Sequence, residues 1–224
     1  MTSVTLPDGR VIEGDCIAAM QTMPAESVDF VLTDPPYIAR YLDRAGRTLA
    51  DDADASWIGP AFAEAYRVLK ENALCVSFYG WPHVDTFMAA WRAAGFRPVG
   101  HLVWSKRYSS RQRFLKYRHE AAYLLAKGNP RPPERTIGDV LAWRYSGNRR
   151  HPTEKSPEIL EPLIPTFTRP GQLVLDPFAG SGSTAVAALR TGRRFVAIEL
   201  EPYYCRIIRG RLWHERRRLA ERAA

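Results

Sequence analysis

Val28-Asp29-Phe30-Val31-Leu32-Thr33-Asp34-Pro35-Pro36-Tyr37 is the run around which the rest of the chain is arranged. Its first residues are mostly β-branched or aromatic, which predicts a short strand buried in the middle of a parallel sheet. Pro35 and Pro36 have no N–H to give to a neighbouring strand, so the strand ends there. A carboxylate, unpaired backbone carbonyls and an aromatic ring therefore leave the sheet together at the carboxyl end of a strand, where open α/β sheets bind ligands.

These groups suit chemistry on the exocyclic amine of adenine or cytosine. That nitrogen is a poor nucleophile because its lone pair is delocalised into the ring. The Asp34 carboxylate and the Pro35 carbonyl can accept its two hydrogens and aim the lone pair at an electrophile. Tyr37 can stack on a base taken out of its helix. The plainer alternative is a strand end where Asp34 caps a turn and Tyr37 fills a gap in the core.

A second predicted strand ends in a glycine-rich turn. Residues 172–176 predict this strand, and Pro177-Phe178-Ala179-Gly180-Ser181-Gly182-Ser183-Thr184 follows it, before a helix over 185–190 and a strand over 195–199. Such a turn lets backbone N–H groups approach a polar or anionic ligand at a helix N-terminus. Glu199, which ends the next strand, can bind the two hydroxyls of a ribose. This half of the chain therefore predicts a site for a nucleoside cofactor.

A dinucleotide-dependent oxidoreductase is the alternative for this half. The run from Gly180 to Ala185 fits the G-x-G-x-x-G/A pattern, and Glu199 lies 17 residues after Gly182. Such an enzyme also needs a group that handles a hydride, and it would leave the Asp-Pro-Pro-Tyr run without a role. The fingerprint alone is therefore weak support.

The composition is that of one globular domain. The 224 residues, 46% of them hydrophobic and 25% charged, suffice for a single α/β domain with a large core. No run of 18 apolar residues occurs, so we expect no membrane span. The first residues lack a basic stretch followed by an apolar one, so we expect no signal peptide. Cys16, Cys75 and Cys205 are odd in number and far apart, which favours reduced thiols in a cytoplasm over disulfides or a zinc site.

Positive charge is concentrated in two parts of a chain whose net charge is +8. Residues 101–155 hold 13 Lys and Arg against 4 Asp and Glu, and residues 206–222 hold 7 Arg against 2 Glu. Over residues 105–118 the cations are interleaved with aromatic rings, which suits phosphates and unstacked bases. This distribution predicts a surface for nucleic acid, and a solvated surface without a partner is the alternative.

The remaining periodicity predicts the other elements of an α/β sheet. Strands are expected over 10–15, 73–79, 97–104 and 120–126, and helices over 16–23, 58–69, 84–94 and 203–222. Residues 38–56 and 128–150 show little periodicity and are expected to form loops. Pro162 and Pro165 predict a kinked or broken helix after Ser156.

Two motifs in a particular order resemble a known enzyme family. Asp34-Pro35-Pro36-Tyr37 followed by Asp176-Pro177-Phe178-Ala179-Gly180-Ser181-Gly182 resembles the amino-group DNA methyltransferases that use S-adenosylmethionine, in the permuted order called the beta class. His151-Pro152-Thr153-Glu154-Lys155-Ser156 is similar to that class's pre-strand motif, with Ser156 where proline is usual. His119-Glu120 matches a position common before the last strand of the catalytic half. The resemblance covers nearly the whole chain.

The resemblance implies a fold and a division of the chain. We expect an α/β protein with a single-domain Rossmann-like methyltransferase fold, circularly permuted, whose mostly parallel seven-stranded sheet has helices on both faces. Residues 1–127 would form the catalytic half, 128–150 a short target-recognition segment, and 151–224 the cofactor-binding half.

The resemblance also implies the reaction and the residues that perform it. S-adenosylmethionine would be the cofactor, and transfer would be direct, without a metal or a covalent intermediate; none of the cysteines follows a proline, as the nucleophile of cytosine carbon-5 enzymes does. The implied catalytic residues are Asp34, Pro35, Pro36 and Tyr37. The implied cofactor contacts are Asp15 on the adenine, Glu199 on the ribose, Thr153, Lys155, Ser183 and Thr184 on the methionine carboxylate, and Asp176, Phe178, Gly180 and Gly182 around the pocket. A solvated lysine at a helix start is the alternative for Lys155.

The Asp-Pro-Pro-Tyr form implies adenine N6 of double-stranded DNA as the target. Cytosine N4 of DNA, adenine N6 of RNA, and an inactive DNA-binding protein stay open as alternatives. The shortness of residues 128–150 predicts a short or relaxed target sequence. The basic tail is expected to bind DNA phosphates or a second copy in a homodimer, and we expect a cytoplasmic protein of a bacterium or phage. The expected DNA contacts are Arg40, Lys106, Arg107, Arg111, Arg113, Lys116, Arg144, Arg149 and Arg150.

Overall fold

The computed structural model describes residues 1–38, 54–109, 111–112, 114–147, 150–151 and 153–223. Most of the expected loop 38–56 therefore lies outside the described residues. In chain order the elements are β1 (Thr2–Leu6), β2 (Gly9–Glu13), α1 (Cys16–Gln21), β3 (Val28–Thr33), α2 (Ile58–Val68), β4 (Leu69–Phe78), η1 (Trp81–His83), α3 (Val84–Ala94), β5 (Arg97–Ser105), β6 (Arg111–Gln112), β7 (Lys116–Tyr117), β8 (His119–Ala126), β9 (Val140–Ala142), α4 (Pro157–Leu160), α5 (Leu163–Phe167), β10 (Leu173–Asp176), α6 (Ser183–Arg190), β11 (Arg194–Glu199) and α7 (Pro202–Ala223).

Within the described residues, the main sheet has nine strands in the order β1-β2-β11-β10-β3-β4-β8-β5-β9. Strands β2, β11, β10, β3 and β4 are parallel, and β8 is antiparallel to both β4 and β5. The expected α/β fold is confirmed, but the expected seven strands are corrected to nine. The additions are the edge strands β1, which pairs with β2, and β9, which pairs with β5. Edge strands need few apolar residues, so the hydrophobic pattern did not reveal them.

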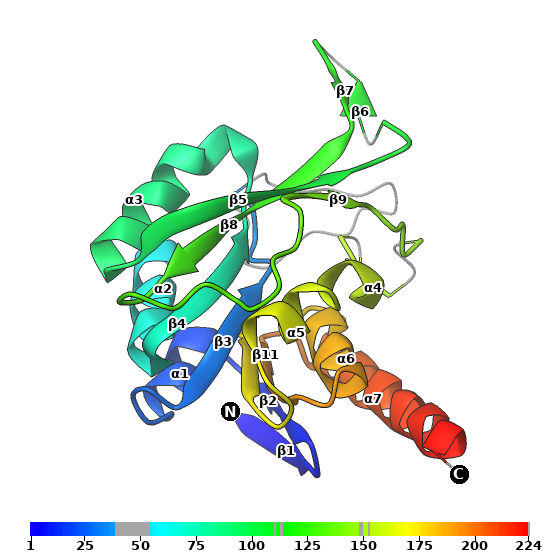
Figure 1. Ribbon diagram of the computed structural model, residues 1–224. Coiled ribbons are helices and arrows are strands. Elements are labelled where there is room, and N and C mark those ends of the chain that lie inside the picture. Colours follow the sequence, from blue (N-terminus) through cyan, green and yellow to red (C-terminus); the bar gives the residue numbers. More distant parts are fainter. Residues whose placement is uncertain (39–53, 110, 113, 148–149, 152, 224) are drawn as a thin grey trace.

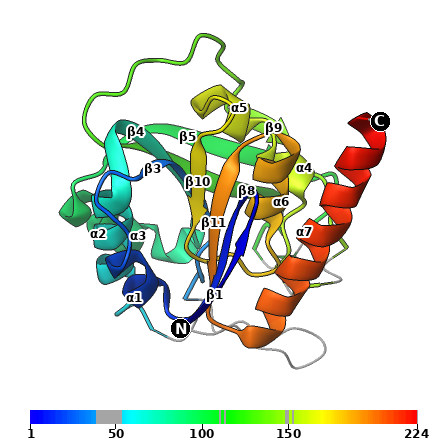
Figure 2. The ribbon, with the colours of Figure 1, turned by 90° about the horizontal axis from the view of Figure 1, so that it is seen from below.

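Helices cover both faces of the sheet, as expected. Figures 1 and 2 show α1, α2 and α3 on one face, and α4, α5, α6 and α7 on the other. Alternate residues of β3 point to opposite faces. Val31 packs in the core with Phe62 and Ala65 of α2, whereas Phe30 and Leu32 pack in the core formed with α4 to α7. The central strand is therefore buried on both sides.

The carboxyl ends of three parallel strands lie side by side. β3 pairs with β10, and β10 pairs with β11. Asp34, the turn after Asp176, and Glu199 consequently leave the sheet at the same edge, which we call the carboxyl edge. This topology brings the two motif-bearing strand ends together.

Residues 128–150 divide between two edges of the sheet. Antiparallel β8 ends at the edge opposite the carboxyl edge, and the chain passes along that opposite edge before β9. β9 then pairs in parallel with β5 and brings the chain back to the carboxyl edge, where Trp143 follows. The expected loop thus contains one strand among its described residues, and the three residues of this strand are too few to show the alternation of apolar and polar residues that marks a strand in the sequence.

Two expectations about helices can also be compared with the structure. The helix expected after Ser156 is broken, as predicted: α4 and α5 are separate, with Pro162 between them and Pro165 inside α5. Among the described residues, no helix is both long and apolar enough to cross a membrane.

Candidate active site

Asp34 is held by two hydrogen-bond donors just beyond β3. The Tyr37 hydroxyl donates to Asp34 Oδ1 at 2.7 Å, and the Lys155 ammonium donates to Oδ2 at 2.7 Å. Lys155 also donates to the Tyr37 hydroxyl at 3.3 Å, and its side chain is only 7% exposed. Gly80 makes room for the loop, because a Cβ there would lie 2.6 Å from the Tyr37 carbonyl oxygen. The three side chains form one network, in which Lys155 is buried and Asp34 and Tyr37 are half-buried.

The electrostatics of this network follow from its burial. Burial raises the pKa of Asp34, although the charge of Lys155 and the two hydrogen bonds act in the opposite direction. Burial acts to lower the pKa of Lys155, but the carboxylates of Asp34 and Glu120 more than offset this and hold it above its usual value. Burial and the charge of Asp34 raise the pKa of Tyr37 well above its usual value. The network therefore combines a neutral phenol with an ammonium–carboxylate pair.

The glycine-rich turn contacts Glu199 through its backbone. The Gly180 N–H donates to Glu199 Oε2 at 2.7 Å, and the Glu201 N–H donates to Oε1 at 2.8 Å. Gly182 has a φ of 83°, and a Cβ there would lie 2.9 Å from the Ile208 side chain, so a glycine is needed where the turn meets α7. Each carboxylate oxygen of Glu199 keeps a further lone pair, which can accept from a ligand hydroxyl.

Burial also changes the two carboxyl groups at the ends of β10 and β11. It raises the pKa of Glu199 to about 7, against the hydrogen bonds from the backbone of Glu201 and Gly180. It raises the pKa of Asp176 to about 7, against the hydrogen bond that this carboxyl accepts from the Phe178 N–H at 3.1 Å. Shifts of this size in a cavity are typical of functional sites.

A cavity of about 460 Å³ lies between the two strand ends. This volume is typical of a small-molecule site. Its walls include these predicted residues: Asp15, Asp34, Pro35, Pro36, Thr153, Phe178, Gly180 and Glu199. A hollow of about 50 Å³ is lined by Asp34 and by these predicted cofactor contacts: Thr153, Lys155, Asp176, Phe178, Gly180, Ser183 and Thr184. Asp34 lines both spaces, so the predicted catalytic carboxylate and the predicted cofactor residues face a common cavity. Tyr37 and Gly182 line neither space.

Two buried hydroxyl groups of the turn already have acceptors. Ser183 Oγ donates to the Lys155 carbonyl oxygen at 2.5 Å, and Thr184 Oγ1 donates to the Leu32 carbonyl oxygen at 3.4 Å. Asp15 caps α1 by accepting from the Ala18 N–H at 2.8 Å. The Ser183 bond ties the glycine-rich turn to the residue that holds Asp34.

Arg211 of α7 is a residue of this region that the sequence did not single out. Its guanidinium lies 3.3 Å from the Glu154 carboxylate and donates to the Ser181 carbonyl oxygen at 2.7 Å. Both side chains are buried, Glu154 to 1% exposure and Arg211 to 11%. Burial lowers the pKa of Arg211 to about 10, although Glu154 acts to raise it. Arg211 therefore fastens the pre-strand motif and the glycine-rich turn to α7.

We expect Arg211→Met to lower the free energy of unfolding by about 2–3 kcal/mol, because among the described residues the buried Glu154 carboxylate would keep only two long hydrogen bonds, from the Arg150 N–H at 3.2 Å and the Arg150 guanidinium at 3.4 Å. Urea unfolding followed by circular dichroism measures the change. The double variant Arg211→Met/Glu154→Gln should recover part of the loss, since it leaves no buried charge unpaired. A single variant within about 0.5 kcal/mol of the unchanged protein would contradict this role.

Among the residues that line the 460 Å³ cavity but were not predicted as site residues, three have aromatic rings. His151, Tyr203 and Tyr204 line it, and the His151 and Tyr204 rings lie 4.5 Å apart. The available signal was the position of the two tyrosines, which begin the helix directly after the Glu199 strand end. Aromatic side chains there provide flat apolar surface beside Glu199.

The predicted DNA contacts are only partly accessible. Lys106 is a correction: it is buried, its ammonium pairs with Glu120, and it lies 4.8 Å from the Trp143 ring centre, so it does not lie on the surface. Its neighbours on both sides in the sequence are exposed, so the charge pattern could not separate it from them. The predicted DNA contacts that are exposed at the carboxyl edge are Arg107, Lys116, Arg144 and Arg150. The predicted DNA contacts whose positions or side chains lie outside the described part of the structure are Arg40, Arg111, Arg113 and Arg149.

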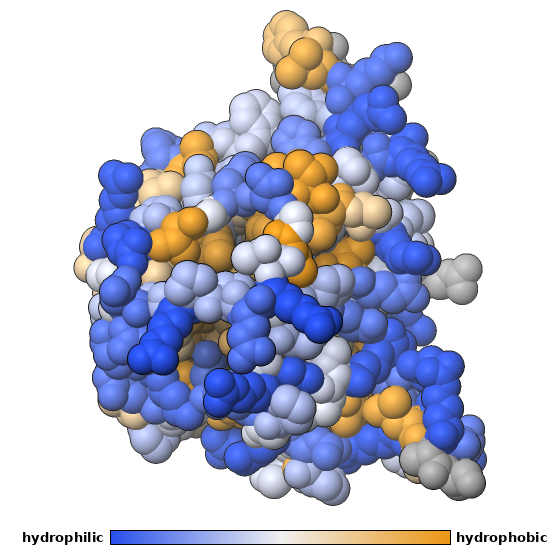
Figure 3. Space-filling model, viewed as in Figure 1, coloured by the Kyte–Doolittle hydropathy of each residue, from blue (hydrophilic) through white to orange (hydrophobic). Residues whose placement is uncertain are grey.

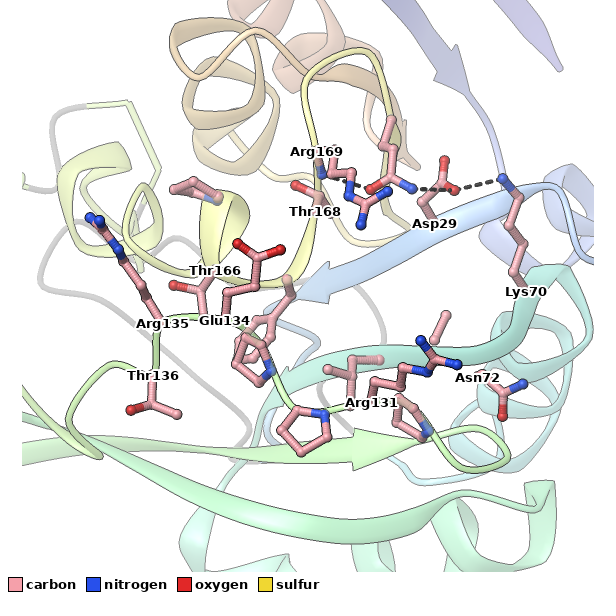
Figure 4. A pocket seen from close by; sticks show the side chains of 18 of the residues that line it. Asp29, Lys70, Asn72, Arg131, Glu134, Arg135, Thr136, Thr166, Thr168 and Arg169 are labelled. Carbon is pink, nitrogen blue, oxygen red and sulfur yellow. Dashed lines mark hydrogen bonds and ion pairs between the residues drawn. The ribbon is translucent and has the colours of Figure 1, made fainter.

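A wider hollow of about 830 Å³ lies at the opposite edge of the sheet. Figure 4 shows Asp29 there, bound by Lys70 at 2.6 Å, with Arg131, Arg135 and Arg169 around the hollow. None of the predicted site residues lines it. It is therefore separate from the site at the carboxyl edge. In the described part of the chain, no group of three or more His, Cys, Asp or Glu could hold a metal ion.

Comparisons with known proteins identify the family of the chain. A family model described as DNA methylase matches residues 28–210. The chain is 56% identical over 215 residues to "Putative methylase YubD" of Escherichia coli K12, covering 96% of this chain and 95% of that protein. It is 28% identical over 241 residues to the DNA adenine methyltransferase YhdJ of the same strain, covering 88% of this chain and 80% of that protein.

Solved structures share the fold. The cytosine-N4-specific PvuII DNA methyltransferase has a TM-score of 0.77 at 20% identity, covering 92% of this chain and 87% of that one. The M1.HpyAVI complex with S-adenosylmethionine has a TM-score of 0.71 at 22% identity, covering 91% of this chain and 98% of that one. With a family match over most of its length and a relative more than half identical across nearly all of it, the chain belongs to the N6/N4 DNA methylases, and it is a DNA methyltransferase whose cofactor is S-adenosylmethionine.

Proposed function

We propose that the protein transfers a methyl group to N6 of adenine in double-stranded DNA. The observation that carries this proposal is the position of Asp34, whose carboxylate faces the same cavity as Gly180 and Glu199. The similarity to YhdJ, named as a DNA adenine methyltransferase, supports adenine. Cytosine N4 is the second candidate, because the cytosine-specific PvuII enzyme shares the fold.

Asp34 and the Pro35 carbonyl accept the two hydrogens of the target amine in this proposal. This hydrogen bonding directs the nitrogen lone pair towards the bound cofactor, which supplies an already activated methyl group. Transfer leaves a cationic amine that is strongly acidic, so its proton can pass to Asp34 or to water. Alignment, rather than strong basicity, is the main contribution of Asp34. Tyr37 holds the Asp34 carboxylate through the hydrogen bond that its hydroxyl donates.

The cavity fits the cofactor group by group. Glu199 has free lone pairs for the ribose hydroxyls, Asp15 lies at the same wall for the adenine, and Phe178 gives apolar surface. Thr153, Ser183 and Thr184 line the 50 Å³ hollow, where we propose that the methionine carboxylate binds. Because the Lys155 ammonium is bound to Asp34, we propose that Lys155 acts on that carboxylate rather than on the cofactor.

One experiment separates the candidate bases. The purified protein is incubated with S-adenosylmethionine and either duplex DNA or RNA, and the nucleic acid is digested to nucleosides for mass spectrometry. N6-methyl-2′-deoxyadenosine, from the DNA alone, is the expected product. N4-methyl-2′-deoxycytidine would overturn the choice of adenine, and methylation of RNA alone would overturn the choice of DNA.

Glu199→Gln should weaken S-adenosylmethionine binding by about ten-fold or more, because an amide replaces the carboxylate that accepts the ribose hydroxyls. In the unchanged protein the affinity should fall as the pH drops below about 7, where Glu199 takes up a proton. The pH dependence of the affinity should become weaker in the variant. Some dependence should remain, because Asp176 also takes up a proton near pH 7. Calorimetric titration at several pH values measures both effects. Equal affinity in the two proteins at high pH would exclude Glu199 as a ribose contact.

The segment that reads the target is short in this proposal. The first part of residues 128–150 lies along the opposite edge. We therefore propose that, within this segment, only the part from Trp143 to its end reaches DNA, and that the hairpin of β6 and β7 contacts the DNA as well. Few side chains can then contact base edges, so we expect a short or relaxed target sequence. Sequencing of methylated DNA at single-base resolution measures its length, and a long, strictly required site would contradict this expectation.

A further inference from the structure

The chain between β5 and β8 forms a two-stranded hairpin that stands out from the carboxyl edge. β6 and β7 pair in it, with Arg111 opposite Tyr117. At its base the Lys106 N–H extends the β5–β8 ladder by donating to the Arg118 carbonyl oxygen at 2.7 Å. Figure 1 shows β6 and β7 projecting away from the body of the protein.

The base of the hairpin is anchored beside the catalytic loop. Tyr117 stacks on Trp81, with ring centres 5.9 Å apart and an angle of 23° between the rings. Trp81 directly follows Gly80, which packs against the backbone of Tyr37. The hairpin therefore rises from the surface next to Asp34, so DNA whose target base enters the site must pass close to it.

The tip of the hairpin is apolar and largely exposed to solvent. Phe114 is 88% exposed and Leu115 is 70% exposed, the two highest values among the large hydrophobic residues of the described chain. Figure 3, in the same view as Figure 1, shows hydrophobic atoms at this tip and hydrophilic surface beside it. Arg107, Lys116 and Arg118 on the same hairpin are exposed cations. An apolar tip between cations is unfavourable in water but suits a duplex, whose stacked bases lie between rows of phosphates.

We propose that Phe114 and Leu115 enter the DNA as an apolar wedge at the base step from which the target adenine is extruded. This role rests on the proposed function. Extrusion breaks stacking on both sides of the base, and an inserted apolar side chain replaces part of the lost contact. Lys116 and its neighbouring cations hold the phosphates on either side of the step. Because the wedge acts on opening of the duplex, it is needed only where the target base is paired and stacked.

The test uses oligonucleotides that carry the target site found by sequencing. One duplex has the target adenine correctly paired, and a second has it opposite an abasic position, so that the base is already free to leave. Phe114→Ala/Leu115→Ala should lower kcat/KM on the paired duplex by about ten-fold or more and change it by less than about two-fold on the pre-opened duplex. S-adenosylmethionine affinity should stay unchanged, which shows that the variant is folded.

Two variants serve as matched controls. Lys116→Ala, on the same hairpin, should lower kcat/KM equally on both duplexes and reduce its salt dependence, since it removes a phosphate contact. Val99→Ala, which removes apolar surface that is 42% exposed near the start of β5, at the edge of the sheet opposite the carboxyl edge, should change neither. Equal loss of activity on the two duplexes in the tip variant, or no loss on either, would overturn the wedge. If the unchanged protein methylates no DNA, the proposed function fails instead.

Discussion

Asp34→Ala should abolish methyl transfer while leaving S-adenosylmethionine binding within a few-fold of the unchanged protein. The variant loses the carboxylate that accepts one amine hydrogen and aims the nitrogen, an effect of about 1,000-fold or more in kcat. It also leaves the buried Lys155 ammonium without its partner at 2.7 Å. We therefore expect a loss of stability of about 3 kcal/mol as well. Single-turnover kinetics with saturating cofactor measures the chemical step.

The companion variant Asp34→Asn separates the two losses. It keeps a side-chain oxygen and the shape of the residue, so its thermal unfolding should lie closer to that of the unchanged protein, while turnover stays low because the amide carries no charge. Turnover near normal in either variant would remove Asp34 from the proposed catalytic role.

Lys155→Met should lower kcat by about ten-fold or more and move the acidic limb of its pH profile to higher pH. Burial raises the pKa of Asp34, and the charge of Lys155 opposes that effect. Without Lys155 the Asp34 pKa rises further, so a larger fraction of Asp34 is protonated at a given pH and cannot accept the amine hydrogen. The pH dependence of kcat reports groups in the enzyme–substrate complex and is the measurement to make.

The control for this prediction is Lys155→Arg, which keeps the positive charge. Its acidic limb should stay near that of the unchanged protein, although the different shape of the guanidinium should still lower kcat. Cofactor affinity distinguishes the two assignments for this residue. A large loss of S-adenosylmethionine affinity in Lys155→Met, with the pH profile unmoved, would return Lys155 to the methionine carboxylate.

Much of the fold and chemistry was available from local patterns. The apolar run before Asp34 and the one before Asp176 predicted the two central strands, and both occur as β3 and β10. The amphipathic spacing of residues 58–69 predicted α2. The family, its cofactor and the α/β class are confirmed. The residue roles in the site stay predictions, with Asp34, Gly180 and Glu199 now on one cavity.

The sequence by itself determined the motif chemistry and the order of the two strand ends, because strand-forming runs, prolines and glycines act on neighbouring backbone. Only the tertiary structure decided which charges meet. Lys155 forms a salt bridge with Asp34, the buried Lys106 forms one with Glu120, and Arg211 forms one with Glu154. Each of these pairs joins different elements of the fold. The sequence shows that such residues are charged, but the burial that sets their pKa and their partners arises only when the sheet and α7 pack together.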